Sequence, residues 1–132
     1  MRLCAEQNAV VEVSLRATLP TADPYNDIHL DVAVETPSGT PLTVPAFWAG
    51  GDTWRFRVAG SEVGEYRYET HCSNSDDSGL HGQTGTIQVR PYKGTNPLLT
   101  HGRLRVAADR RHFEHRDGTP FFWLGDTWWM GL

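Results

Sequence analysis

Hydrophobic and polar residues alternate along much of the chain between residues 10 and 90. In residues 11–19, Val, Leu and Ala alternate with charged and hydroxyl-bearing residues, and residues 28–35 repeat this pattern. Similar alternation returns in residues 53–58, 64–70 and 86–90. A period of two residues is typical of a β-strand that buries one face. The pattern therefore predicts a series of short strands rather than helices.

Turn-forming residues separate these runs. The sequences TPSGTP (36–41) and AGGD (49–52) contain proline, glycine or aspartate, which favour turns. The run between them, residues 42–50, contains Pro45, which cannot donate a hydrogen bond to a neighbouring strand. We therefore expect that strand at a sheet edge or at a bulge. Residues 72–85 are polar and rich in glycine, and they predict a long surface loop.

The two aromatic runs, residues 53–58 and 64–70, predict a β-hairpin. In the expected register three pairs of residues face each other: Trp54 with Tyr68, Phe56 with Tyr66, and Arg57 with Glu65. The aromatic pairs would lie on the buried face and the charged pair on the solvent face, each contributing about 0.2–1 kcal/mol. A shift by one residue would reverse both faces.

The order of these elements predicts an all-β protein. Several short strands at this spacing, separated by turns, are typical of an antiparallel immunoglobulin-like β-sandwich, which we expect over residues 1–91. Residues 92–102 predict a linker. Residues 103–132 predict three further short strands, with turns at Asp109 and at Asp117-Gly118.

Composition limits the classes of protein that the chain can represent. Its 132 residues suit about one domain, and a hydrophobic share of 39% with 21% charged residues favours a packed core over disorder. The net charge is −4, and acidic residues lie between the basic ones along the chain. Neither a nucleic acid nor a membrane is therefore expected as a partner.

The N-terminal residues and the cysteines bear on the cellular compartment. No stretch approaches the roughly 18 apolar residues that span a bilayer, and residues 1–16 lack the apolar core of a signal peptide. The chain as given is expected in the cytoplasm, or outside it if an upstream leader was removed. Free thiols are favoured for Cys4 and Cys72 over a disulfide, because the apolar residues can form a core without a cross-link.

The last residues, FFWLGDTWWMGL (121–132), are unusually apolar for the end of a chain. Residues 101–132 as a whole resemble the point where an N-terminal β-sandwich of the DUF5060 type joins an apiosidase-like (DUF4038-type) glycoside hydrolase barrel. The stretch DGTPFFWLGDTWW (117–129) is the most specific part of this resemblance. The stretches PSGTPLTVPAFWAGGDTWRFRV (37–58) and GEYRYET (64–70) look like strands and turns of that sandwich.

The resemblance implies that the chain is the non-catalytic N-terminal sandwich portion of a glycoside hydrolase, which braces the barrel and shapes the carbohydrate cleft. Residues 105–116 would form a hairpin that seals the bottom of a (β/α)8 barrel. The apolar run after Gly118 would be its first strand, with the barrel truncated soon afterwards. Glycoside hydrolysis usually requires two carboxyl groups about 5–9.5 Å apart, which a barrel supplies from several strands. The chain alone is therefore expected to be inactive, and no catalytic residue is assigned.

Four residues are candidates for binding carbohydrate. By the resemblance, Asp126, Thr127 and Trp128 would lie at the sugar-facing rim of the barrel, where the carboxylate accepts hydrogen bonds from hydroxyls and the indole stacks on a sugar ring. Asp126 and Thr127 could instead form a turn or a helix cap. Trp48 is either an exposed stacking residue or a residue packed beneath a loop, whereas Trp54 is expected in the core.

Neither a metal nor a cofactor is expected. His112 and His115 would point to opposite faces of a strand, and residues 74–79 lack the spacing of a calcium-binding loop. Two other functions remain open: a free-standing carbohydrate-binding module, and a structural or oligomerisation domain. To avoid a large exposed apolar patch, residues 120–132 are expected either to fold onto the sandwich and the 103–116 hairpin or to bury against a second copy.

Overall fold

The computed structural model describes residues 1–125 and residue 127. Contacts divide the chain into two compact units, Met1–Lys93 and Gly94–Leu132. No helix in the described residues has the length and apolar character needed to cross a membrane. Each unit is described separately below.

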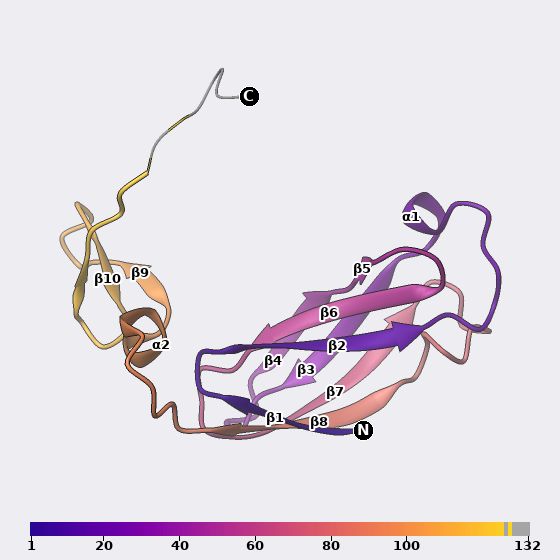
Figure 1. The fold of residues 1–132 in the computed structure, drawn as a ribbon, viewed down its shortest axis with the longest axis horizontal. Coiled ribbons are helices and arrows are strands. Elements are labelled where there is room, and N and C mark those ends of the chain that lie inside the picture. Colours follow the sequence, from indigo (N-terminus) through magenta and orange to yellow (C-terminus); the bar gives the residue numbers. More distant parts are fainter. Residues whose placement is uncertain (126, 128–132) are drawn as a thin grey trace. The chain divides into compact units, whose positions relative to one another are not determined.

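The first unit is a β-sandwich of two sheets (Figure 1). One layer is a five-stranded sheet with the order β1 (Arg2–Glu6), β8 (Thr84–Arg90), β7 (Gly64–Cys72), β3 (Leu30–Glu35) and β4 (Pro41–Pro45). The other is a three-stranded sheet with the order β2 (Val10–Arg16), β6 (Thr53–Ala59) and β5 (Phe47–Trp48). Neighbouring strands are antiparallel, apart from the parallel pair β1 and β8. The prediction of an all-β, antiparallel sandwich is confirmed, with this parallel edge pair as an addition.

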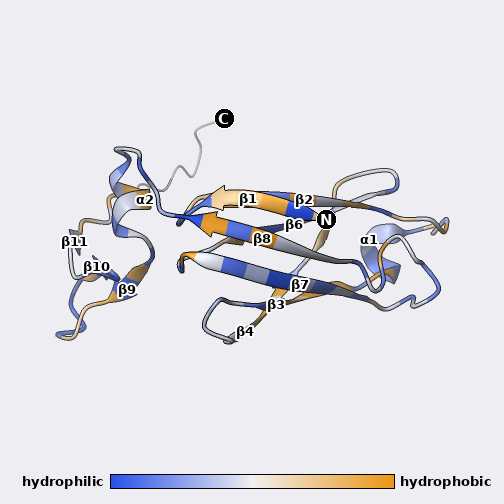
Figure 2. Ribbon diagram, turned by 90° about the horizontal axis from the view of Figure 1, so that it is seen from below, coloured by the Kyte–Doolittle hydropathy of each residue, from blue (hydrophilic) through white to orange (hydrophobic). Residues whose placement is uncertain are grey.

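Alternating residues from both sheets form the core between the layers. Along β3, buried and exposed positions alternate without interruption from Leu30 to Glu35. Figure 2 shows hydrophobic and hydrophilic residues alternating in the same way along the second half of β8. The main core cluster contains residues of both layers: Val13, Val32, Val34, Phe56, Val58, Tyr66, Tyr68, Ile87 and Val89. The period of two residues therefore identified the buried face of β2, β3, β6, β7 and β8, whereas β1 was not predicted as a strand.

The predicted hairpin between residues 53–58 and 64–70 is wrong. β6 pairs with β2 and β5, whereas β7 pairs with β3 and β8, so the two strands belong to different sheets. The connection between them crosses from one layer to the other at Gly60, where an added Cβ would lie 2.6 Å from Val89. Alternation specifies which face of a strand is buried but not which strand lies beside it. The aromatic residues therefore meet across the core instead of along one sheet.

Pro45 marks the place where the chain changes sheets. β4 is the edge strand of the larger sheet, and Pro45 is its last residue, opposite Asp31 of β3. Beyond it, the backbone N–H of Ala46 donates to the carbonyl of Leu30 at 2.9 Å, and β5 then joins the smaller sheet. The prediction that Pro45 lies at a sheet edge is confirmed, because an edge position tolerates the missing donor.

The loop predicted over residues 72–85 is less exposed than expected. Asp77 and Leu80 are only 3% and 1% exposed. The Asp77 carboxylate accepts hydrogen bonds from the backbone N–H and hydroxyl of Thr18 at 2.9 and 2.8 Å, and from the backbone N–H of Leu19 at 3.3 Å. Polarity alone suggested a solvated loop, but the loop fastens the segment after β2 through one buried carboxylate.

The second unit contains a helix and a three-stranded antiparallel sheet. The helix α2 (Pro97–His101) lies within residues 92–102, which were predicted as a linker. β10 (Phe113–His115) is the central strand between β9 (Leu104–Val106) and β11 (Pro120–Phe121). Three short strands were predicted here, with turns that include Arg110 (φ 59°) and Gly118 (φ 90°). No barrel is closed by the described residues.

The apolar residues after β11 are largely exposed. Phe122 and Leu124 are 85% and 82% exposed, while the ring of Trp123 lies 5.3 Å from that of Phe113. Within the second unit, Phe122 and Leu124 are therefore not covered by the 103–116 hairpin. β11 ends at Phe121, so no neighbouring strand fixes the residues that follow. Burial against a second copy stays a prediction.

Candidate functional site

Three of the four predicted binding residues are consecutive, at 126–128, and the fourth, Trp48, lies in the sandwich. Asp126 and Trp128 lie outside the described residues, so their place at a sugar-facing rim stays a prediction. Thr127 is exposed. Trp48 lies on the edge strand β5 and is 38% exposed, whereas Trp54 is 4% exposed and belongs to the core, as predicted. Trp48 is therefore the predicted residue around which the structure allows a site to be built.

Trp48 lines a groove of ≈ 440 Å³ at the side of the sandwich. The groove, called the α1–β5 groove below, is formed by the helix α1 (Pro24–Asp27), the start of β3 and the segment that leads from β4 into β5. Its lining residues are Tyr25, Asn26, Ile28, His29, Leu30, Asp31, Pro45, Ala46, Phe47, Trp48 and Trp54. The groove thus combines tyrosine, phenylalanine and tryptophan rings with the polar side chains of asparagine, histidine and aspartate.

The Trp48 ring is oriented by a hydrogen bond of its indole nitrogen. Along the backbone ladder, Trp48 lies opposite the buried Trp54 of β6. The Trp48 Nε1–H donates to the carbonyl of Gly51 at 2.9 Å. That bond spans a turn in which Gly50 and Gly51 have φ of 101° and 56°, conformations that glycine adopts without strain. The polar edge of the indole is satisfied within the protein, which leaves the apolar ring face to interact with a ligand.

Tyr25 is a lining residue that sequence reasoning missed. It lies on α1 and is 75% exposed. The helix begins after Asp23, whose Oδ1 accepts a hydrogen bond from the backbone N–H of Asn26 at 3.3 Å, and Pro24 occupies its first turn. An Asp-Pro pair at this spacing is a helix-start signal. It could have indicated the helix, although not the strands that the helix faces.

The backbone at His29 joins the groove to the neighbouring loop. The N–H of His29 donates to the hydroxyl of Ser73 at 3.0 Å, and its carbonyl accepts from the backbone N–H of Ser73 at 2.8 Å. His29 and Asp31 are both exposed and flank the buried Leu30. The two hydrogen bonds hold the backbone immediately before β3, beside these polar side chains.

The comparisons with known proteins place the sandwich in a family. The model of the family described as "Domain of unknown function (DUF5060)" matches residues 5–73, just over half of the 132 residues. This chain belongs to the DUF5060 family. The matched residues of the DUF5060 sandwich run from β1 through β7 and include every lining residue of the α1–β5 groove.

A solved structure extends the likeness beyond the family match. The chain is similar to the crystal structure of a putative glycoside hydrolase from Bacteroides vulgatus ATCC 8482, with a TM-score of 0.74 and 28% sequence identity. The similarity covers 91% of this chain and 21% of that chain. The DUF5060 chain thus spans about a fifth of the length of that protein. None of the curated proteins matches it.

An ion cluster supports β5 from the outer face of the smaller sheet. Glu12 accepts hydrogen bonds from Arg55 at 2.9 Å and from Arg57 at 2.8 Å, and the Arg57 guanidinium lies 5.0 Å from the centre of the Phe47 ring. The hydrogen bond from Arg57, with the charge of Arg55, lowers the pKa of Glu12 below its usual value. The predicted pairing of Arg57 with Glu65 is wrong, because β2 rather than β7 lies beside β6. The Arg57 guanidinium thus covers the ring of Phe47, the residue before Trp48, on the outer face of the smaller sheet.

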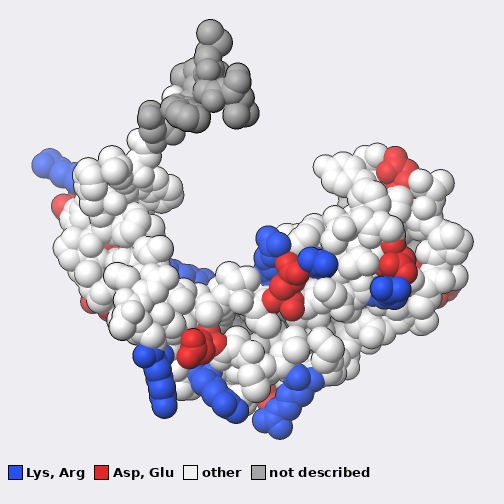
Figure 3. Space-filling model, in the orientation of Figure 1, with Lys and Arg blue, Asp and Glu red and all other residues white. Residues whose placement is uncertain are grey.

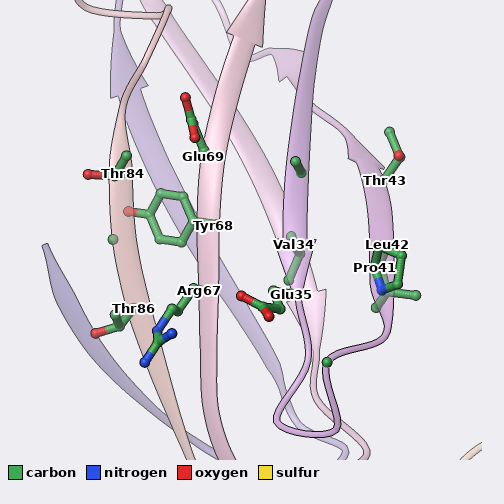
Figure 4. A pocket seen from close by; sticks show the side chains of 13 residues that line it. Val34, Glu35, Pro41, Leu42, Thr43, Arg67, Tyr68, Glu69, Thr84 and Thr86 are labelled. Carbon is green, nitrogen blue, oxygen red and sulfur yellow. The ribbon is translucent and has the colours of Figure 1, made fainter.

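A second hollow of ≈ 660 Å³ lies over β4, β3, β7 and β8. Figure 4 shows its labelled side chains, among them Glu35, Arg67, Thr84 and Thr86. Its one aromatic residue, Tyr68, is 5% exposed, and burial raises the pKa of its hydroxyl. This hollow therefore offers hydroxyl and charged groups without an exposed ring. On the visible face in Figure 3, acidic and basic side chains are interspersed. The α1–β5 groove is the better candidate for binding a ligand.

Proposed function

We propose that this chain is the non-catalytic N-terminal sandwich portion of a glycoside hydrolase, in which it braces the catalytic barrel and shapes one side of the carbohydrate cleft. The likeness to the Bacteroides vulgatus protein carries this proposal. It covers nearly all of this chain but only 21% of the other, as expected for an accessory domain in a larger enzyme. Within this proposal the barrel is apiosidase-like, of the DUF4038 type.

The second unit is the part of the chain that would join the barrel. In the proposed arrangement, β9 and β10 form the hairpin at the bottom of the barrel, and the segment after Gly118 begins the first barrel strand. The exposure of Phe122, Trp123 and Leu124 (85%, 65% and 82%) supports this, because a barrel strand is covered on both faces. Asp126, Thr127 and Trp128 would follow at the rim that faces the sugar.

The chain alone is proposed to lack hydrolase activity. Glycosidic cleavage usually needs one carboxyl group to protonate the leaving oxygen and another to act as nucleophile or base, on opposite sides of the bond. In the proposed enzyme both would come from barrel strands outside this chain. The test is to assay the 132-residue protein against aryl glycosides and polysaccharides, beside a protein that carries the coding sequence beyond Leu132. Turnover by the short chain would overturn the proposal, as would a downstream sequence without barrel strands.

Bracing has its own test in the longer protein. Removing residues 1–91 should lower the midpoint of thermal unfolding of the barrel, because the domain contacts that the sandwich supplies would be lost. A barrel of unchanged stability and unchanged kinetics after this deletion would contradict a bracing role.

A second candidate function is self-association through residues 120–132. The large exposed fractions of Phe122 and Leu124 favour it, since two copies could cover these side chains mutually. The two candidates differ in their requirement for a barrel: self-association would occur with the isolated chain.

A further inference from the structure

We infer that the α1–β5 groove is a binding site for a neutral saccharide on the sandwich itself. The inference deepens the proposed function, on which its choice of ligand class rests, by adding a sugar-binding surface outside the catalytic barrel. The groove's volume of ≈ 440 Å³ is within the range of about 300–1,000 Å³ typical of small-ligand sites.

Exposed aromatic rings supply the apolar part of the site. Tyr25 and Trp48 line the groove from opposite elements, α1 and β5, and are 75% and 38% exposed. The C–H groups on one face of a pyranose carry slight positive charge, and they are attracted to the negative face of an aromatic ring. Burial of both surfaces adds a hydrophobic contribution.

The site is largely formed before a ligand arrives. The Trp48 indole is oriented by its bond to Gly51 at 2.9 Å, and α1 is capped by Asp23, which also accepts a hydrogen bond from Asn26 Nδ2 at 2.6 Å. A preformed site loses less conformational entropy when it binds. A stacking ligand could therefore use the rings without reorganising the sandwich.

Polar groups in the groove match the hydroxyl groups of a sugar. Asn26, His29 and Asp31 all line it and are exposed, and together they provide both donors and acceptors. Sugar hydroxyls donate and accept in the same way. A purely apolar ligand would displace water from the exposed side chains of His29 and Asp31 without offering them hydrogen bonds, which favours a polyhydroxylated ligand over a lipid or an aliphatic peptide segment.

The charge of the groove selects among saccharides. Its lining, as described, contains the carboxylate of Asp31 and neither lysine nor arginine. Asp27 adds a second carboxylate at the end of α1. Uronate or sulfate groups would therefore meet a negative field without a basic partner. A neutral sugar is the class that this groove fits.

Affinity electrophoresis of the 132-residue chain tests the inference. Native gels would contain galactomannan, xyloglucan, mixed-linkage β-glucan or arabinan as neutral polymers, and polygalacturonate as an acidic one. The variants are Tyr25→Ala and Trp48→Ala. Phe113→Ala is the matched control, since Phe113 is 39% exposed, close to the 38% of Trp48, but lies in the second unit. Circular dichroism would confirm that each variant is folded.

We expect at least one neutral polymer to retard the wild-type chain and polygalacturonate to have no effect. Tyr25→Ala and Trp48→Ala should each weaken binding about fivefold to tenfold, and Phe113→Ala should leave it unchanged. Tyr25 is so exposed that its removal should not disturb folding, so its variant remains informative if Trp48→Ala unfolds.

Three results would overturn the inference: no retardation by any of the neutral polymers, retardation by polygalacturonate alone, or equal weakening by the Phe113 control. None of these would remove the proposed bracing role, which requires no affinity of the sandwich for sugar. Conversely, a stable and active barrel after deletion of residues 1–91 would refute bracing without affecting saccharide binding by this chain.

Discussion

The rings of Phe56 and Tyr68 meet edge to face across the core, with centroids 5.1 Å apart and an interplanar angle of 68°. Phe56 belongs to β6 in the smaller sheet and Tyr68 to β7 in the larger one, and both are buried. This pair therefore connects the two layers rather than two neighbouring strands. Aromatic contacts of this geometry contribute about 0.5–1.5 kcal/mol beyond the burial of their area.

Replacing Phe56 by Ala should destabilise the sandwich by about 3–5 kcal/mol, because it removes a fully buried ring and leaves a cavity between the sheets. Urea unfolding monitored by tryptophan fluorescence would measure the change in the free energy of unfolding. Phe113→Ala is the control, since Phe113 is partly exposed in the second unit. A loss below about 1 kcal/mol for Phe56→Ala would contradict the described core.

Replacing Asp77 by Ala should cost about 1–3 kcal/mol for each backbone donor left without a partner. The carboxylate receives hydrogen bonds from Thr18, Leu19 and Gly79, and Asp77 is 3% exposed. Asp76→Ala is a matched control, because Asp76 adjoins Asp77 in the sequence but its side chain is exposed. Chemical denaturation of both variants measures the difference. Equal stability of the two would show that Asp77 does not fasten the loop.

Asp77 should also make stability depend on pH. Burial opposes its ionisation, but the hydrogen bonds from Thr18, Leu19 and Gly79 outweigh burial and lower the pKa of Asp77. A lowered pKa in the folded state stabilises the fold above the unfolded pKa of about 4, and this contribution is lost as the pH falls through the folded value. Asp77→Asn should reduce the slope of stability against pH below about 4. An unchanged slope would contradict this assignment.

The hydrogen bond between His101 and Asp117 should fasten α2 to the turn before β11. His101 Nδ1 lies 2.7 Å from Asp117 Oδ2, and hydrogen bonds from His101 and Thr119 hold the pKa of Asp117 well below its usual range. His101→Gln should therefore speed amide hydrogen exchange at Gly102 and Thr119. His112→Gln is the control, because His112 pairs with Asp109 at the other turn. Equal exchange in both variants would contradict the proposed link.

Protonating Asp117 should have the same local effect. Because its folded pKa is lowered, the stabilisation is present above the ordinary aspartate pKa of about 4 and is lost as the pH falls further. Exchange at Thr119, whose N–H donates to Asp117 Oδ1 at 3.0 Å, should therefore accelerate in acid in the wild type. The acceleration, corrected for intrinsic exchange, should be absent from Asp117→Asn.

The exposed residues Phe122 and Leu124 should make the chain associate as its concentration rises. Sedimentation velocity over a range of concentrations would detect a dimer or larger species, and the double change of Phe122→Ser and Leu124→Ser should restore a monomer. Val63→Ser, which removes an exposed apolar side chain elsewhere, should not. A wild-type chain that remains monomeric at high concentration would rule out self-association through this segment.

The candidate site was predictable only in part. Trp48 could be singled out because it lies near the turn at Gly50-Gly51, where an aromatic ring can be exposed. Tyr25 could not, because its relevance depends on α1 facing the start of β3 and the crossing into β5. The polarity of residues 72–85 suggested a solvated loop around Asp77. The burial of its carboxylate could not be predicted, because the donors on Thr18 and Leu19 are far from Asp77 in the sequence.

The sequence by itself determined the buried face of the alternating runs between residues 11 and 90, the position of turns between them and the edge position of Pro45. These are local properties, because alternation, proline and glycine act within a few residues. Only the tertiary structure decided which strands are neighbours. β6 and β7 follow each other in the chain, yet they lie in opposite layers, and Phe56 meets Tyr68 across the core. The hydrophobic effect is not directional, so an alternating strand can bury its apolar face whichever strand lies beside it. Only the packing of the whole core decides which strands become neighbours and which lie in opposite sheets.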